Sequence, residues 1–299
     1  MISVIIATRN RPLALRECLV SLGKCANTAH EIIIADQSDA TDTAVQKYIR
    51  AHPKIRYYTL KSKGKSRALN FILPKAKGDI VALTDDDCIA SPTWLASITY
   101  FFNSHGDTSG VFGKVLPFQP QKHKNMICPC TFTKTKQRVF NKPIYHAANI
   151  GFGNNMAFRK KIFNQSVKFR DWLGPGSVAG TANDAYLTLQ LLTQGNALAY
   201  EPDIVMYHNR WLTKKEMRKQ DLSYTCGEMA CYGYFHFQGY SFATQIIRSN
   251  FASSWHNLKP GKSLYYELSK IFYKFRGLYI AWIYSHVDRL TLTHTIRSK

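Results

Sequence analysis

The chain has 299 residues, of which 45% are hydrophobic and 13% aromatic, and this content excludes a disordered chain because it can bury a large core. Forty lysines and arginines against 19 aspartates and glutamates give a net charge of +21, which favours a surface that attracts phosphate in nucleotides, nucleic acid or anionic lipid. An ordinary solvated basic surface would explain the charge equally well. No apolar run approaches the ~20 residues that cross a bilayer.

Short β-branched runs alternate with helix-like segments over the first hundred residues. In chain order, we predict strands over residues 2–8, 31–38, 55–60 and 79–84, with helices from Pro12, from about Thr41 and over residues 66–73. Ser91 and Pro92 then supply an N-cap and a first-turn proline for a further helix. This rhythm is typical of a Rossmann-like α/β fold, a mostly parallel sheet with helices on both faces.

The second half of the chain has a less regular pattern, with a strand-like segment over residues 110–118 and a basic loop over 119–141. Apolar residues at Leu187, Leu191 and Leu192 predict a helix that ends at Gly195. After Trp211 the composition shifts to tyrosine, phenylalanine, lysine and arginine. We therefore divide the chain into an α/β domain, residues 1–211, and a helical, basic and aromatic C-terminal region, residues 212–299.

Seven cysteines at irregular spacing do not form a disulfide framework. The close pair Cys128-Pro-Cys130 has no second pair at the spacing of a zinc site, so we interpret these residues as structural thiols. The N-terminal stretch MISVIIATRNRP has no basic region followed by a long apolar segment. We therefore expect a cytoplasmic protein.

Polar residues follow three of the predicted strands, at the sheet edge where ligands of such folds bind. They are Thr8-Arg9-Asn10, Asp36-Gln-Ser-Asp39 and Asp85-Asp86-Asp87. A single aspartate there would start a turn or cap a helix, but three adjacent carboxylates repel one another unless a cation or hydrogen-bond donors offset them. We interpret the three aspartates as a site for a divalent cation whose shell substrate phosphates complete, with Lys61, Lys63, Lys65 and Arg67 attracting those phosphates.

Other phosphate-binding classes lack their motifs. The chain has no G-x-x-x-x-G-K-[ST] loop, and Gly151-Phe-Gly153 lacks the third glycine of a dinucleotide fingerprint. A sugar nucleotidyltransferase would show a glycine-rich loop after the first strand, where this chain has ATRNRP. A basic nucleic-acid-binding protein remains an alternative, but it gives the three aspartates no role, so we expect no nucleic-acid partner.

Seven motifs in order, over residues 1 to about 210, resemble those of the family 2 glycosyltransferases, which have the A-type glycosyltransferase fold. They are SVIIATRN, IIIADQS, GKSRALN, IVALTDDDC, GFGNNMAFRK, GPGSVAGTANDAYL and VMYH. The resemblance implies a hexosyltransferase that inverts the anomeric centre, with Mg²⁺ or Mn²⁺ and a nucleotide diphosphate sugar as donor. The acceptor would be a hydroxyl of a glycan or a lipid-linked molecule, as in the synthesis of cell-surface polysaccharides or glycoconjugates.

The resemblance also implies roles for individual residues. Those that would contact the nucleotide are Thr8, Arg9, Asn10, Asp36 (at the base, often uracil), Arg67, Asp85 and Asp86. Asp85 and Asp87 would be the outer members of the Asp-x-Asp motif, with Asp87 on the metal and Asp85 nearer the ribose. His208 would reach the metal or the diphosphate, although a histidine after a strand is also compatible with simple packing.

The catalytic base implied by the resemblance is Asp184. Relatives carry an acidic pair at this helix start, whereas this chain has Asn183-Asp184, so the usual glutamate is replaced. The helix dipole would favour the ionised carboxylate of Asp184, and an aspartate that merely caps the helix is the alternative. A noncatalytic relative is a further alternative, which Asn183 would explain.

Four other residues are open to two interpretations. Asn154, Asn155 and Arg159 lie where relatives contact donor or acceptor, and a tight turn explains them nearly as well. Trp172 could stack on a sugar ring or be buried at the base of a loop. The basic, aromatic residues 212–299 favour either peripheral attachment to an anionic membrane, on its cytoplasmic face, or a lid that packs on the catalytic domain.

Overall fold

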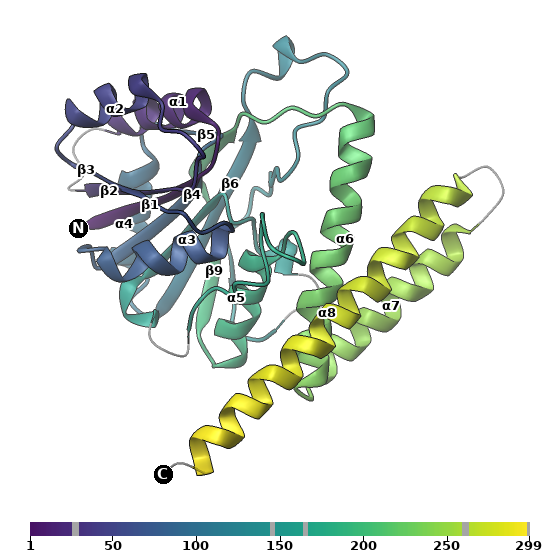
Figure 1. Cartoon of the computed structure of the whole chain (residues 1–299). Helices are drawn as coiled ribbons and strands as arrows, with labels where there is room; N and C mark the ends of the chain where they lie inside the picture. The colour runs from purple at the N-terminus through teal and green to yellow at the C-terminus, as the bar shows by residue number, and fades with distance from the viewer. Residues whose placement is uncertain (26–29, 144–146, 164–166, 259–262, 298–299) are drawn as a thin grey trace.

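The protein is described by a computed structural model, in which residues 1–25, 30–143, 147–163, 167–258 and 263–297 are placed. A mixed α/β domain is followed by three long helices (Figure 1). The predicted α/β class and the helical C-terminal extension are confirmed. Among the placed residues, no helix has both the length and the apolar character that a membrane span requires.

The α/β domain is built on one mixed sheet with the strand order β3-β2-β1-β4-β8-β6-β9-β5, in which β7 also pairs with β9. The strands are β1 (Ile2–Thr8), β2 (His30–Asp36), β3 (Ile55–Thr59), β4 (Ile80–Asp85), β5 (Cys88–Ala90), β6 (Thr108–Pro117), β7 (Arg138–Phe140), β8 (Asn155–Arg159) and β9 (Ala197–His208). The first four strands are mutually parallel, as predicted. The short strands β5, β7 and β8 join as antiparallel neighbours, which the sequence did not predict.

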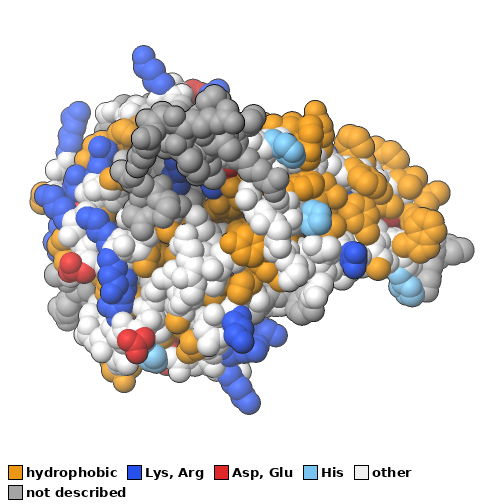
Figure 2. Space-filling view, turned by 90° about the horizontal axis from the view of Figure 1, so that it is seen from below, with side chains coloured by type: hydrophobic (Ala, Val, Ile, Leu, Met, Phe, Trp, Pro, Cys, Tyr) orange, Lys and Arg blue, Asp and Glu red, His pale blue; other side chains and the backbone are white. Residues whose placement is uncertain are grey.

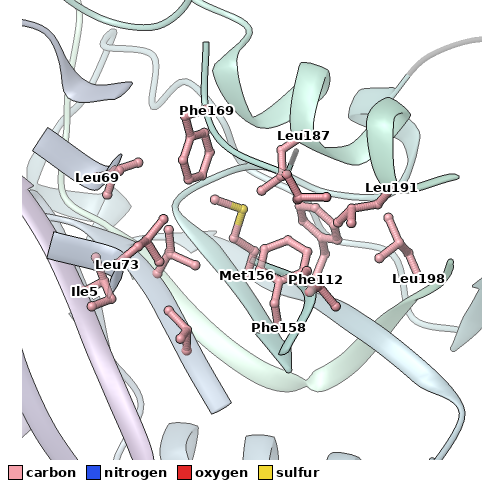
Figure 3. Close-up of a cluster of buried hydrophobic side chains, with 14 of the residues drawn as sticks. Ile5, Leu69, Leu73, Phe112, Met156, Phe158, Phe169, Leu187, Leu191 and Leu198 are labelled. Atoms are coloured by element: carbon pink, nitrogen blue, oxygen red, sulfur yellow. The ribbon is translucent and has the colours of Figure 1, made fainter. Parts of the chain in front are cut away.

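Successive residues of each strand point to opposite sides of the sheet, so both faces carry side chains to be buried. Helices cover both of these faces. The helices of this domain are α1 (Pro12–Gly23), α2 (Thr43–Arg50), α3 (Lys65–Ile72), α4 (Trp94–Ser104) and α5 (Asn183–Thr193). One core packs α3 and α5 against Ile5, Leu83 and Phe158, and Figure 3 shows part of it. The opposite core packs α1, α2 and α4 against Val4 and Ile6.

The start predicted for α4 is wrong by two residues. Ser91 was expected to cap a helix beginning at Pro92, but the helix begins at Trp94, and no side chain caps it. Instead, the backbone N–H of Trp94 donates to the carbonyl of Ser91 at 2.9 Å, so Ser91, Pro92 and Thr93 form a turn that leads into the helix.

The C-terminal region consists of α6 (Lys214–Phe237), α7 (Ser241–Asn257) and α8 (Leu264–Arg297). A capping box starts α6, in which Glu216 accepts from the N–H of Thr213 at 2.8 Å. A third core joins α6 and α8 to the loop before α5, where buried Trp172 stacks on Tyr284 with ring centroids 4.9 Å apart. The burial of Trp172 favours the second of its two interpretations, a tryptophan at the base of a loop, over a residue that stacks on a sugar ring. Because this core draws on both sides of residue 211, the division there stays a prediction.

Helices α6 and α8 approach each other closely at glycines. A side chain at Gly277 of α8 would collide with the carbonyl of Cys226 and lie 2.9 Å from Cβ of Met229. A side chain at Gly233 of α6 would lie 2.8 Å from Cβ of Ala281. The two helices can pack at this distance only because these positions carry no Cβ.

We predict that Gly277→Ala destabilises the protein, although alanine ordinarily favours a helix over glycine by about 1 kcal/mol. The added methyl group forces the helices apart, and overpacking of this kind costs about 1–3 kcal/mol. Urea unfolding measures the change. Gly106→Ala is the control, since its methyl group would meet no atom within 4 Å. Equal stability of the two variants would contradict the close packing.

Candidate active site

A cleft of about 610 Å³ opens at the carboxyl ends of the parallel strands. The register brings these ends together, since Thr8 of β1 pairs with Asp36 of β2 and Ala7 pairs with Asp85 of β4. Loops around residues 151–154 and 175–185 and one face of α6 complete its walls. Of the predicted site residues, the cleft is lined by Thr8, Arg9, Asp85, Asp86, Asp87, Asp184 and His208.

The first two of the three adjacent carboxylates are neutralised by partners from other elements. Asp85 pairs with the largely buried ammonium group of Lys65 at the start of α3. Buried Asp86 accepts from Thr8 Oγ1 at 2.7 Å and pairs with Arg11 at 3.0 Å. Burial, followed by the charge of Asp87, raises the pKa of Asp86 to about 6, although Arg11 and Thr8 oppose the shift. The chain thus supplies its own donors against the repulsion that pointed to a cation.

Asp87 lies between Arg11 and His208. Its Oδ2 accepts from Arg11 at 2.7 Å, and its Oδ1 lies 3.3 Å from Nε2 of His208. Nδ1 of His208 lies 2.7 Å from the carbonyl of Pro129 and donates to it, so Nε2 is the nitrogen that faces Asp87. Burial alone would lower the pKa of His208, but its contact with Asp87 raises it to about 10. Despite burial, the same contact and Arg11 hold the pKa of Asp87 below its usual range.

The residues around Asp87 fit a divalent cation. Oδ1 of Asp87 is buried and, beyond its ion pair with His208, has no hydrogen-bond partner among the placed residues. Asp87, Cys88 and His208 each offer a ligand atom, and these atoms lie within 4.8 Å of one another. Nδ1 of His208 donates to the carbonyl of Pro129 and so directs Nε2 toward Asp87, and a cation bound at Nε2 would have to displace the proton that the ion pair with Asp87 holds there.

The ligand set favours a hard cation on oxygen and nitrogen. Burial raises the pKa of the Cys88 thiol well above its ordinary value, so the thiol stays protonated and is a poor ligand. Asp85 lies outside this cluster and is engaged by Lys65. A role for Asp85 on the metal therefore stays a prediction.

Asp184 lines the cleft from the first turn of α5 and is half-buried. Its Oδ2 accepts from the N–H of Gly153 at 2.7 Å and its Oδ1 from the N–H of Ala185 at 2.9 Å. A Cβ at Gly153 would lie 2.9 Å from the carboxylate, so this contact requires glycine. The two bonds fix the carboxylate while leaving each oxygen a lone pair for a further donor.

The neighbouring Asn183 is buried in a tight position. A Cβ at Gly174, where φ is +98°, would lie 2.9 Å from Cγ of Asn183. Asn183 also lines the cleft, so this position presents a neutral amide beside Asp184 where the resemblance implies a glutamate.

Three predicted nucleotide contacts do not line the cleft: Asn10, Asp36 and Arg67. Asp36 is buried, accepts from the Tyr57 hydroxyl and accepts from the N–H of Ser38 at 2.7 Å. Arg67 lies near the surface, 3.4 Å from Asp171. The nucleotide contacts assigned to these residues stay predictions. A nucleotide-sugar donor would have to change the present contacts of Asp36 and Arg67 in order to bind to these side chains.

Asn10 is engaged by the loop after β2, since its Nδ2 donates to Asp39 at 2.8 Å and its Oδ1 accepts from the N–H of Asp39 at 3.0 Å. Its φ of +55° is a left-handed conformation that asparagine tolerates. The contacts of Asn10 therefore hold the turn after β1.

Asn154, Asn155 and Arg159 were expected either to contact donor or acceptor or to form a tight turn, and two of them have structural contacts. Asn155 accepts from Nε1 of Trp94 at 2.8 Å, and Arg159 donates to backbone carbonyls, including that of Phe102 at 2.9 Å. Asn154 instead lines the cleft, and its buried Oδ1 has no hydrogen-bond partner within the placed ranges. Asn154 is therefore the member of this group that is available to a ligand.

Comparison with known proteins decides the family. The family model described as Glycosyl transferase family 2 matches residues 3–166, more than half of the chain. The chain belongs to glycosyl transferase family 2. No curated protein matches it.

Solved structures share the A-type glycosyltransferase fold with this family 2 protein. The mannosyltransferase PcManGT from Pyrobaculum calidifontis, in complex with GDP-Man and Mn²⁺, is 16% identical with a TM-score of 0.60, over 97% of this chain and 86% of that one. S. aureus TarS 1-349 is 14% identical with a TM-score of 0.56, over 92% of this chain and 71% of that one. The structure of TarS 1-349 in complex with UDP-GlcNAc is 19% identical with a TM-score of 0.56, over 70% of this chain and 58% of that one.

Several residues that line the cleft of this family 2 protein were missed or unassigned in the sequence. They are Arg11, Gln37, Cys130, Arg210, Tyr224 and Glu228. Arg11 could have been found, since it belongs to the same polar run after β1 as Thr8. The others had no local signal, because Tyr224 and Glu228 reach the cleft only through the packing of α6, and Tyr224 meets the thiol of Cys130 at 3.1 Å.

We predict that Arg11→Ala lowers the free energy of unfolding by about 1–3 kcal/mol, because it leaves Asp86 and Asp87 without their shared partner. The loss is smaller than for a fully buried pair, since the Arg11 side chain is 42% exposed. Thermal unfolding measures it. Arg16→Ala, an exposed arginine on the same helix, is the matched control and should stay within about 0.5 kcal/mol of wild type. An unchanged Arg11→Ala protein would show that the carboxylates do not depend on this arginine.

Proposed function

We propose that the protein is a metal-dependent, inverting glycosyltransferase of the hexosyl type that uses a nucleotide diphosphate sugar. The observation that carries this proposal is one cleft that is lined by Asp87 and His208, whose side chains could hold a cation, and by a separately held carboxylate, Asp184. Glycosyl transfer needs these two elements, a positive charge at the departing diphosphate and a base at the acceptor.

The cation would be Mn²⁺ or Mg²⁺, held by Oδ1 of Asp87 and Nε2 of His208, and it would stabilise the negative charge of the leaving diphosphate. PcManGT in complex with GDP-Man and Mn²⁺ supports this choice. Arg9 and Arg210 also line the cleft and would supply positive charge for phosphate oxygens, whereas Lys65 is paired with Asp85.

Asp184 is the proposed base. Its carboxylate would accept the proton of the acceptor hydroxyl as that oxygen attacks the anomeric carbon, and the Gly153 and Ala185 amides would hold it in place. Glu228 is the cleft carboxylate outside the three adjacent aspartates that competes with Asp184 for this role, but it projects from α6 rather than from the helix start that the family motif marks. The two carboxylates therefore have to be distinguished by substitution.

We propose a UDP-sugar as the first donor to test and a glycan or lipid-linked hydroxyl as the acceptor. TarS crystallised with UDP-GlcNAc supports uracil, while PcManGT with GDP-Man supports guanine, so both bases belong in a donor screen. We further propose that the reaction takes place in the cytoplasm. In support, all seven cysteines are free thiols, which is typical of a reducing compartment.

A noncatalytic relative is the second candidate. It is favoured by the neutralisation of all three aspartates by Lys65, Arg11 and His208, because the site can then fold without a cation. Such a protein would bind a nucleotide without releasing the diphosphate from any donor.

We predict that purified protein with Mn²⁺ releases nucleoside diphosphate from at least one sugar donor in a screen of UDP- and GDP-sugars. Asp184→Asn should lower kcat by about 10²–10⁴-fold, because it removes proton transfer in the transition state. Glu228→Gln should keep most of the activity, and Asp107→Asn, an exposed aspartate, should equal wild type.

The outcomes separate the candidates. Loss of turnover in Glu228→Gln but not in Asp184→Asn would move the base to α6. Inert wild type that still binds UDP or GDP would favour the noncatalytic relative.

A further inference from the structure

A second cavity, of about 500 Å³, adjoins the catalytic cleft. It lies between the loop at residues 177–180, the first half of α6 and the middle of α8. Arg210 and Gln220 line both cavities, and Arg210 Nη2 lies 3.2 Å from Oε1 of Gln220. A ligand in this cavity, named here the α6–α8 groove, could therefore extend into the cleft.

The α6–α8 groove is positively charged. Arg210, Lys219 and Arg276 line it, against the single carboxylate of Glu216. That carboxylate is already engaged in the capping box of α6, where it accepts from Thr213 N–H at 2.8 Å and Thr213 Oγ1 at 2.7 Å. Lys219 is exposed and makes no ion pair or hydrogen bond with the placed residues. The groove is thus suited to an anionic group.

An apolar stripe runs along the exposed side of α8. It consists of Tyr265, Leu268, Phe272, Phe275, Tyr279 and Trp282, whose exposed fractions range from 46% at Trp282 to 83% at Tyr265. Their spacing of three and four residues puts them on one face of the helix. Figure 2 shows hydrophobic side chains gathered over the end of the molecule that α7 and α8 form.

The stripe and the groove meet at Arg276. Within residues 264–288 of the helix, Arg276 is the one lysine, arginine or acidic side chain that is exposed. It follows Phe275 of the stripe, lines the groove, and reaches the carbonyl of Val178 at 3.3 Å. A cation at the junction of an apolar face and a charged groove suits a molecule with an anionic head and an apolar chain.

We propose that the α6–α8 groove binds the phosphate of an amphiphilic acceptor and that the apolar stripe of α8 binds its hydrocarbon chain. This inference rests on the proposed function, since the hydroxyl end of the acceptor would pass Arg210 and Gln220 to reach Asp184. The acceptor class is therefore a lipid-linked phosphate. A second copy of the chain on the stripe would bury the aromatic residues but would leave the adjoining cationic groove without a ligand.

The test is calorimetric titration with dodecyl phosphate below its micelle concentration, with inorganic phosphate and dodecyl maltoside as comparison ligands. We expect wild type to bind dodecyl phosphate more tightly than either of them. The double variants Lys219→Ala/Arg276→Ala and Phe272→Ser/Tyr279→Ser should each bind it at least about tenfold more weakly. Lys214→Ala/Lys215→Ala removes the same charge from exposed positions of α6 outside the groove and should equal wild type.

Several results would overturn the inference. They are equal affinity of all variants for dodecyl phosphate, equal affinity of wild type for inorganic phosphate, or a wild-type dimer in sedimentation that Phe272→Ser/Tyr279→Ser converts to monomer. Binding of UDP with Mn²⁺, measured on the same samples, should be unchanged in every variant. If wild type does not bind UDP with Mn²⁺, the result counts against the proposed function. The affinities of the variants for dodecyl phosphate test the groove separately.

Discussion

The packing of three consecutive carboxylates beside β1, two of them buried, is the constraint on which the site depends. Adjacent negative charges in a partly dry cleft are costly unless positive groups lie against them. The parallel pairing of β1 with β4 places the start of α1, and with it Arg11, beside Asp86 and Asp87. Lys65 and His208 arrive from α3 and β9, so three elements distant in sequence must meet at the same edge of the sheet. The charge balance and the fold are therefore coupled.

Much of the fold could be predicted from local sequence, and the exceptions have physical causes. Residues 2–8 and 79–84 are rich in β-branched residues, and helix-like segments separate such runs along the chain. The structure has the expected parallel strands at both runs. The strands β5 and β7 are three residues long and form only by pairing with β9, so their own residues carry little signal. Likewise, α4 begins after a backbone turn at Ser91, although serine before proline favours a cap.

Site residues could be predicted from the sequence where they directly follow a strand or belong to a family motif, and less well elsewhere. Asp87, Asp184 and His208 share one cleft, as their motifs implied, while Asp36 accepts from Tyr57 and is not among the residues that line the cleft. Arg11 neutralises two carboxylates, and although it belongs to the polar run after β1, only the pairing of β1 with β4 shows which carboxylates it meets. The wall formed by α6 depends on the glycine contacts with α8, which only the tertiary structure reveals. Sequence therefore identified the chemical groups better than their partners.

The most direct test of the account is the uptake of Mn²⁺, followed by the loss of its free electron paramagnetic resonance signal as protein is added with UDP. We predict that wild type and Cys88→Ser take up the ion, and that Asp87→Asn and His208→Leu do not, because Oδ1 of Asp87 and Nε2 of His208 are the proposed ligands. Uptake by Asp87→Asn equal to that of wild type, or no uptake by wild type, would contradict the account.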